Sequence, residues 1–288
     1  MRLALSLLAL PLLAAPPFEW KTGANQRHEL FENGKPVLVY NAGVESRPEA
    51  PPERARCCYV YPLYTPAGVS PLDDFPKDHW HHRGLFWAWP YVSINGKVHD
   101  IWMKMDGIHD VTGAPIKTTT QGKLARLDSE NYWEADGVRI VRERASITVH
   151  PAQGNARTLD LKLTFEALDK PVELRGSQEK GKSYGGLNVR FAPREATTIR
   201  SSDGPVPKDT DLVAHEWAEF EAVYGGKRAV VRFESDKRNP HAPPQWCLRY
   251  YGFVGAAFPG RTESVSGYTL VKGKPLTLRY RVTLTDLL

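Results

Sequence analysis

Two long segments of the chain alternate strictly between apolar and polar residues. In residues 158–168, one face of an extended chain carries Leu159, Leu161, Leu163, Phe165 and Ala167, and the other carries Asp160, Lys162, Thr164 and Glu166. Residues 276–284 repeat the pattern with Leu276, Leu278, Tyr280, Val282 and Leu284 on one side. A period of two residues is that of a β-strand with one buried and one hydrated face. We therefore predict two long antiparallel strands.

Two glycine-containing dipeptides indicate β-hairpins. Asn95-Gly96 and Gly225-Gly226 each separate two strand-like runs, and both readily adopt the positive φ angles of a type I′ turn. A segment before the second turn, residues 211–223, also fits an amphipathic helix, but the glycine pair favours a hairpin arm. Further strands are expected near residues 37–40, 58–63, 85–88, 138–149, 184–191 and 248–254. The predicted class is all-β, as a large antiparallel β-sandwich.

The first 15 residues have the pattern of a secretory signal peptide. Arg2 is followed by an apolar run that ends in Ala14 and Ala15, and cleavage is expected after one of these two residues. No later apolar run approaches the roughly 20 residues that a membrane span requires. We therefore expect residues 16–288 to form a single β-sandwich domain, secreted or periplasmic, without a membrane span.

Charge and cysteine content narrow the functional classes only slightly. The 38 Lys and Arg residues stand among 33 Asp and Glu residues, without a basic stripe interleaved with aromatic residues, so no nucleic-acid partner is expected. Export would permit one disulfide between Cys247 and either Cys57 or Cys58. Equally, all three cysteines can be buried as small apolar residues.

The densest group of ionisable residues is the stretch DHWHHRG. Imidazole gives or takes a proton near neutral pH, and a neighbouring carboxylate can orient it, so the candidate catalytic residues are Asp78, His79, His81 and His82. Arg83 would bind a carboxylate or a polarised oxygen. The alternative is a copper or zinc site on His79 and His81, which an extended segment would point to the same side. No cofactor is otherwise expected.

Tryptophans around this stretch suggest a saccharide ligand. Sugars present apolar C–H faces that stack on indole rings, while their hydroxyl groups need charged or amide partners. Trp80 is the candidate stacking residue. Trp87 and Trp89 share a register with Leu85 and are expected in the core.

A second polar group lies about 160 residues further along the chain. Asp236, Asn239 and His241 belong to a segment that three prolines keep out of a sheet, and Trp246 and Arg249 return to a strand. Asp236 is a further candidate catalytic residue, as a base or as a group that orients a histidine. A loop this rich in polar and aromatic residues is a candidate binding rim. The alternative is a rigid connection with solvated charges. We expect the sandwich to bring His81, Arg83, Asn239 and Arg249 to one concave face.

Four sequence blocks together carry a family resemblance. Residues 61–89, 91–102, 184–191 and 239–260 resemble the secreted bacterial family catalogued as methane oxygenase PmoA, and the resemblance runs from about Pro36 to Thr285. It implies a fold similar to the supersandwich of galactose mutarotase-like proteins. Within these blocks, Arg190 is a further candidate for binding ligand oxygens.

The sequence therefore predicts a carbohydrate-active protein that performs acid/base chemistry on a saccharide. One alternative is a sugar-binding protein without catalysis. A second is a copper- or zinc-dependent enzyme, as the family label suggests.

Overall fold

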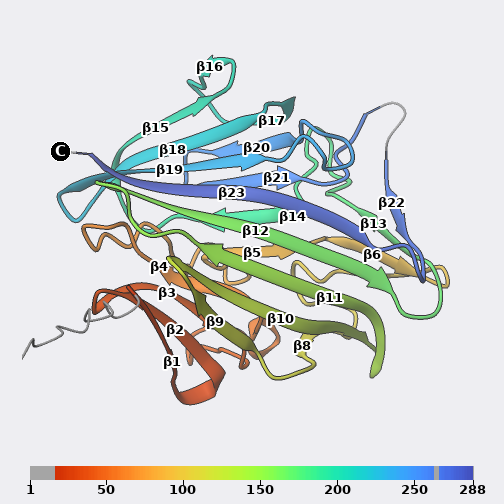
Figure 1. Ribbon diagram of the computed structural model, residues 1–288. Coiled ribbons are helices and arrows are strands. Elements are labelled where there is room, and N and C mark those ends of the chain that lie inside the picture. The colour runs from red at the N-terminus through yellow and green to blue at the C-terminus, as the bar shows by residue number, and fades with distance from the viewer. Residues whose placement is uncertain (1–16, 263–265, 288) are drawn as a thin grey trace, which may run out of the picture.

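The computed structural model describes residues 17–262 and 266–287. The regular secondary structure of these residues is almost entirely β-strand. The only helices among them are two 3-10 turns, η1 (Ala24–Gln26) and η2 (Pro52–Arg54). All paired strands in the two large sheets are antiparallel, and the sheets pack face to face as a sandwich (Figure 1). The predicted all-β class with large antiparallel sheets is confirmed. The predicted signal peptide lies outside the described residues.

The first sheet has nine strands. Across the sheet they are β1 (Phe18–Thr22), β2 (Arg27–Glu32), β3 (Lys35–Asn41), β4 (Tyr59–Leu63), β5 (Leu85–Ala88), β14 (Gly186–Arg190), β21 (Phe253–Ala257), β20 (Gln245–Arg249) and β17 (Thr210–Ala214).

The second sheet has ten strands. Across the sheet they are β16 (Gly204–Pro205), β15 (Glu195–Ser201), β18 (Trp217–Tyr224), β19 (Lys227–Ser235), β23 (Leu276–Leu287), β12 (Ala156–Ala167), β11 (Val138–Val149), β10 (Leu124–Ala135) and β8 (Ile108–Thr112), and β9 (Lys117–Gln121) also pairs with β10.

A small four-stranded sheet lies at one end of the sandwich (Figure 1). Its strands are β22 (Tyr268–Leu270), β13 (Val172–Arg175), β6 (Tyr91–Ile94) and β7 (Lys97–His99). The turn between β6 and β7 has φ angles of 52° at Asn95 and 78° at Gly96, so the predicted hairpin is confirmed. The second predicted hairpin, at Gly225 and Gly226, joins β18 to β19, and the helix that residues 211–223 also fitted does not form.

The predicted strand at residues 248–254 is wrong, because two strands occupy this segment. β20 ends at Arg249 and β21 begins at Phe253. Between them Gly252 has a φ of +107°, and a side chain at this position would collide with the guanidinium of Arg194. A left-handed conformation at this glycine turns the chain back instead of extending it.

Strand β10 was missed because its inward face is partly polar. Ser129 and Asn131 are buried among the apolar residues of this face. Asn131 donates to the Glu143 carboxylate (2.9 Å), and Trp133 donates to the other oxygen of the same group (2.8 Å). Tyr40 of the facing sheet donates to Ser129 (3.1 Å). These bonds partly compensate the cost of burying a carboxyl group in the core, and burial raises the pKa of Glu143.

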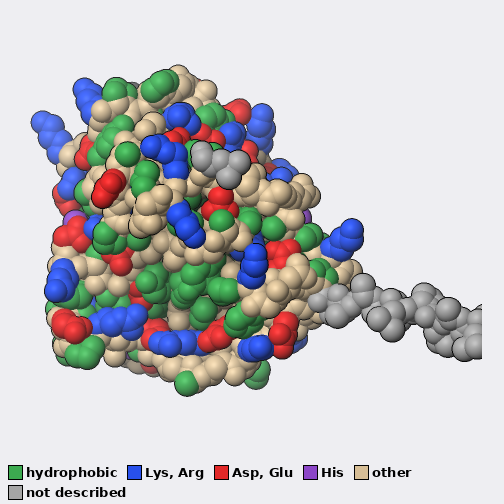
Figure 2. Space-filling model, turned by 90° about the vertical axis from the view of Figure 1, so that its left-hand side faces the viewer, with side chains coloured by type: hydrophobic (Ala, Val, Ile, Leu, Met, Phe, Trp, Pro, Cys, Tyr) green, Lys and Arg blue, Asp and Glu red, His purple; other side chains and the backbone are tan. Residues whose placement is uncertain are grey.

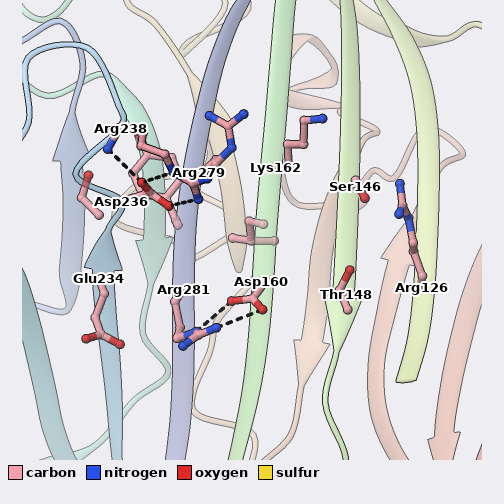
Figure 3. Close-up of a pocket in the computed structure, with 13 residues that line it drawn as sticks. Arg126, Ser146, Thr148, Asp160, Lys162, Glu234, Asp236, Arg238, Arg279 and Arg281 are labelled. Atoms are coloured by element: carbon pink, nitrogen blue, oxygen red, sulfur yellow. Dashed lines mark hydrogen bonds and ion pairs between the residues drawn. The ribbon is translucent and has the colours of Figure 1, made fainter. Parts of the chain in front are cut away.

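The outer faces of the two large sheets differ. Long loops cover the outer face of the nine-stranded sheet, whereas the ten-stranded sheet presents a bare polar face with a hollow of about 570 Å³ (Figure 3). On the side of the molecule in Figure 2, basic and acidic side chains are interspersed. This mixture agrees with the dispersed charges of the sequence.

The apolar centre of the sandwich gives a first testable prediction. Phe165 on β12 is fully buried, with its ring 5.1 Å from Trp89 and 5.6 Å from Trp133. Replacing Phe165 with Ala removes these contacts and leaves a cavity, so we expect the free energy of unfolding to fall by about 3–5 kcal/mol. Urea denaturation measures this change.

Thr164 provides the control because it lies on the opposite, hydrated face of the same strand. The change Thr164→Ala should alter the free energy of unfolding by no more than roughly 0.5 kcal/mol. Equal losses in the two variants would contradict the assigned register of β12.

Candidate functional site

The loop between β4 and β5 folds over the outer face of the nine-stranded sheet. The middle and the last residue of the loop are fixed to the end of β14: Asp73 N donates to Arg190 O (3.0 Å), and Arg190 N donates to Gly84 O (3.0 Å). Leu72 also forms an isolated bridge with Phe191. The three histidines of the sequence motif are thereby held above the sheet.

The histidine segment is not extended, so the extended geometry that would point His79 and His81 to the same side is not present. His79 N donates to Pro76 O (2.9 Å) and His82 N donates to His79 O (2.8 Å), which makes two consecutive turns. These turns bring all three imidazoles together. The ring centroids are 4.6 Å apart for His79 and His82, 4.5 Å for His81 and His82, and 5.6 Å for His79 and His81.

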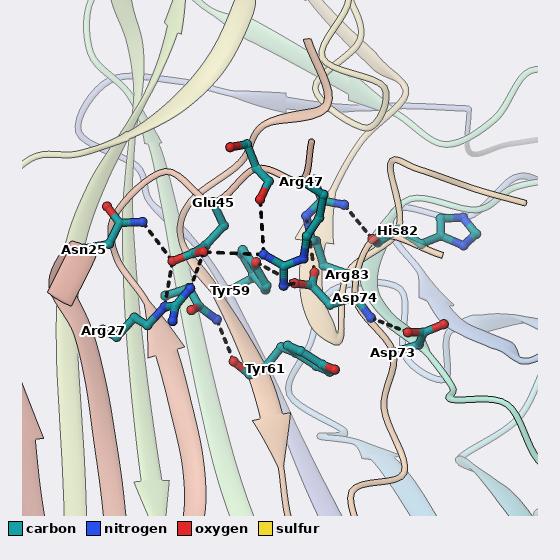
Figure 4. Close-up of polar contacts among 12 residues, drawn as sticks. Asn25, Arg27, Glu45, Arg47, Tyr59, Tyr61, Asp73, Asp74, His82 and Arg83 are labelled. Carbon is teal, nitrogen blue, oxygen red and sulfur yellow. Dashed lines mark hydrogen bonds and ion pairs between the residues drawn. The ribbon is translucent and has the colours of Figure 1, made fainter. Parts of the chain in front are cut away.

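Arg83 fixes these turns through hydrogen bonds to their carbonyl oxygens. Its guanidinium donates to the carbonyl oxygens of Trp80 (2.9 Å) and His82 (2.6 Å), and also to that of Arg54. Its Nε lies 3.6 Å from a carboxylate oxygen of Asp74 (Figure 4). The residue is 0 % exposed. Arg83 therefore positions the loop, and the predicted contact with ligand oxygens is not available to it.

A cavity of about 310 Å³ opens beside the histidines. Cys247, Arg249 and Phe253 form its floor, because strand alternation points them away from the other sheet. The remaining walls come from three separate loops and from the turn between β20 and β21, which carries Tyr251. The lining comprises His79, His81, His82, Trp102, Met103, Glu179, Lys182, Tyr184, Cys247, Arg249, Tyr251 and Phe253.

Aromatic rings form much of the cavity wall. Tyr251, which is 42 % exposed, stacks on His79 with centroids 5.0 Å apart and planes 3° apart. His82 stacks on Phe253 at 4.9 Å, and Trp102 meets His82 edge-on at 5.7 Å. A flat ligand face would meet ring faces and ring edges here.

Two of the histidines are uncharged at neutral pH. Burial, reinforced by the neighbouring His79 and Arg54, lowers the pKa of His81 to about 3. Burial also lowers the pKa of His82 well below its usual value, and this side chain is 2 % exposed. Within the described part of the chain, Nδ1 of His82 has no hydrogen-bond partner. An unsatisfied buried nitrogen costs roughly 1–3 kcal/mol, which a ligand group can recover.

Charged side chains at the cavity are paired. Asp78 accepts from Arg190 Nη2 (2.8 and 2.7 Å) and from His79 Nδ1 (2.9 Å). Burial opposes the charge of Asp78, but these two hydrogen bonds lower its pKa overall. Arg249 donates to Asp211 (2.9 Å) at the cavity floor. Asp78 and Arg190 therefore orient His79, and Arg249 is the arginine that lines the cavity.

Apart from Arg249, the second predicted group does not join the cavity, so the prediction of one face shared by His81, Arg83, Asn239 and Arg249 is wrong. The loop that follows β19 begins at the ten-stranded sheet, where Asn239 donates to Arg279 O (2.7 Å) and accepts from Arg279 N (2.7 Å). Asp236 is bound by Arg238 in the hollow of that sheet.

Three other predicted residues also lie outside the cavity. His241 packs near Phe258, with ring centroids 5.9 Å apart. Trp246 is buried and donates to His215 O (2.7 Å). Trp80 is half-buried and does not line the cavity. Trp87 and Trp89 are buried, as predicted.

Several residues at or beside the cavity were not among the predicted site residues. Trp102, Tyr184 and Tyr251 line the cavity from loops that the local pattern did not connect with the histidines. Asp100 accepts from Met103 N (2.8 Å) in the same loop as Trp102. Burial raises the pKa of Asp100 to about 6, so this carboxyl group titrates near neutral pH.

The thiols and the metal alternative can also be placed. All three cysteines are buried and free, and Cys57 Sγ lies 2.7 Å from Cys58 Sγ. Among the described residues, the one set of three ligand atoms close enough to hold a metal ion is Cys57, Cys58 and Asp110. The Nζ atom of Lys104 also contacts the Asp110 carboxylate. The histidines do not form such a set.

Comparisons with known proteins identify a family. A family model described as a family of unknown function, DUF6807, matches residues 28–287. The chain belongs to the DUF6807 family. The resemblance to the methane oxygenase PmoA family stays a prediction. A search of curated proteins finds no match.

Two solved structures resemble this DUF6807 protein over most of its length. One is a heparinase III, with 10% sequence identity and a TM-score of 0.40; the match covers 95% of this chain and 37% of that protein. The other is an aldose epimerase homologue from C. elegans, with 7% identity and a TM-score of 0.40; the match covers 95% of this chain and 100% of that one. No helix in the described residues is long and apolar enough to cross a membrane.

The burial of His81 predicts an acid-sensitive fold. The unfolded chain takes up a proton at His81 below pH 6.5, whereas the folded chain does so only near pH 3, so acidification favours unfolding. Between about pH 7.5 and pH 5, this residue should cost the native protein about 1–2 kcal/mol. The variant His81→Gln should therefore lose less stability over this interval, as measured by urea denaturation.

His109 on β8 is an exposed histidine and serves as the control. The variant His109→Gln should keep the full pH dependence of the native protein. Identical pH dependence in His81→Gln and the native protein would show that His81 is not desolvated in the folded state.

Proposed function

We propose that the histidine cavity binds a saccharide and that its imidazoles transfer protons in a reaction on that saccharide. One observation carries the proposal: three imidazoles lie side by side in the cavity wall, and Asp78 orients one of them, His79, through its Nδ1. An imidazole that a carboxylate orients can accept the proton of a ligand hydroxyl and return it. In this proposal His79 is the catalytic base, and the uncharged His81 donates a hydrogen bond to a ligand oxygen.

The composition of the wall supports a sugar as the ligand. Ring faces such as that of Tyr251 suit the C–H faces of a pyranose, and the Arg249 guanidinium suits its oxygens. A volume of about 310 Å³ lies at the lower end of the roughly 300–1,000 Å³ range of ligand pockets. A small saccharide therefore fits better than a long chain.

The available acids favour proton transfer over glycoside hydrolysis. Most glycosidases place two carboxyl groups across the scissile bond. The described lining of this cavity contains one carboxylate, Glu179. It is already bound by Lys182 (2.6 Å) and Tyr184 (3.2 Å). An isomerisation or epimerisation, in which a proton leaves and returns, matches this site better.

The test separates catalysis from binding. A panel of mono- and disaccharides is screened for binding by calorimetry and for conversion by NMR. In His79→Gln the proton acceptor is lost while the length of the side chain is kept, so turnover should fall by about 10²-fold or more with little change in affinity. In Tyr251→Ala a stacking face is lost, so affinity should fall about 5-fold to 10-fold.

Trp80→Ala is the matched aromatic control, because Trp80 belongs to the loop that carries the three histidines but does not line the cavity. This variant should keep both affinity and turnover. Binding that is unaffected by His79→Gln and is accompanied by no conversion would leave a sugar-binding protein. Absence of binding to the whole panel would refute the assignment of a saccharide ligand.

A further inference from the structure

Two positive charges face each other on the outer face of the ten-stranded sheet. Lys162 on β12 lies directly opposite Arg279 on β23. In the neighbouring row of the same two strands, Asp160 lies opposite Arg281 and accepts from its Nε (2.8 Å). Like charges opposite each other destabilise a sheet, whereas the opposite charges in the next row stabilise it. An anion bound between Lys162 and Arg279 would therefore relieve the repulsion between these two side chains.

The nearby acids do not supply this anion, because other groups bind them. Asp160 is held by Arg281 and by His150 (2.7 Å), and Asp236 is held by Arg238 (2.5 Å). Among the described residues, neither Lys162 nor the Arg279 side chain has an acidic partner within 4.0 Å. Figure 3 shows both side chains standing on adjacent strands without a dashed line to an acid, while Asp160 and Asp236 are each joined to an arginine.

These two cations lie in a hollow of about 570 Å³. The hollow extends over five adjacent strands, β19, β23, β12, β11 and β10, which corresponds to about 19 Å at the usual strand spacing. Ser146 flanks Lys162 on β11, and Thr148 lies in the neighbouring row. Their hydroxyl groups can donate to and accept from a polar ligand.

We propose that this hollow binds an acidic oligosaccharide, with one carboxylate or sulfate group held between Lys162 and Arg279. Its breadth and hydroxyl groups suit a chain of sugars. The flanking carboxylates of Asp160, Glu234 and Asp236 would repel a densely charged polyanion, which favours a chain with isolated anionic groups between neutral sugars. The hollow lies on the opposite sheet from the histidine cavity, so this proposal is independent of the proposed function.

The experiment uses hyaluronan hexasaccharide, in which carboxylates alternate with neutral sugars, and chitohexaose as the neutral probe of equal length. The native protein should bind the hyaluronan probe with an affinity that falls as salt rises, and should bind chitohexaose at least 10-fold more weakly. In the double variant Lys162→Gln/Arg279→Gln, affinity for the hyaluronan probe should fall at least 10-fold. Calorimetry at two salt concentrations measures both effects.

The double variant Arg228→Gln/Arg232→Gln removes the same charge from β19, outside the hollow, where both arginines pair with acids. It should bind the hyaluronan probe like the native protein, and so should His79→Gln, which tests the other site. Thermal unfolding verifies that each variant is folded. Equal binding of the two probes, unchanged affinity in Lys162→Gln/Arg279→Gln, or an equal loss in the control would each overturn the proposal.

Discussion

A buried guanidinium fixes the histidine cavity. Burial lowers the pKa of Arg83 to about 10, so the group remains charged at neutral pH and must keep its partners inside the protein. Those partners are the Asp74 carboxylate and the carbonyl oxygens of Trp80, His82 and Arg54. Two of these carbonyls belong to the histidine turns. The hydrogen bonds that the buried Arg83 guanidinium requires therefore fix the positions of the imidazole rings, although Arg83 itself does not line the cavity. A lysine could not hold several carbonyl groups and a carboxylate in one plane.

The two outer faces of the sandwich use polar groups in opposite ways. On the nine-stranded sheet, loops exclude water and drive imidazoles to their neutral forms. On the ten-stranded sheet, charged rows stay hydrated, and their pattern is set by the register of neighbouring strands. Between the sheets, the Glu143 carboxyl group is satisfied by Asn131 and Trp133. Polar residues therefore form the neutral imidazole group under the loops, the hydrated charged rows of the open sheet and the buried network around Glu143, according to how far each is exposed to water.

The sequence predicts what depends on local pattern. The long strands around Leu159–Ala167 and Leu276–Leu284 and the turn at Asn95-Gly96 are encoded within a few residues, and they are present. The composition of the cavity depends on loops that meet only in the folded chain, so Trp102 and Tyr251 gave no signal beside the histidines. Arg83 was wrongly predicted to contact ligand oxygens for a related reason, because the sequence does not show that this side chain is buried.

The position of β23 has a consequence for how the chain reaches its native state. This strand, made of residues 276–287, lies between β19 and β12 in the middle of the ten-stranded sheet. Until it has been synthesised, β8 to β12 and β15 to β19 cannot form one sheet, and the edges of β12 and β19 stay open. Unpaired edges in a partly made chain invite association with other chains. This sheet is therefore complete only after residues 276–287 have been synthesised, and until then the edges of β12 and β19 are exposed to other chains.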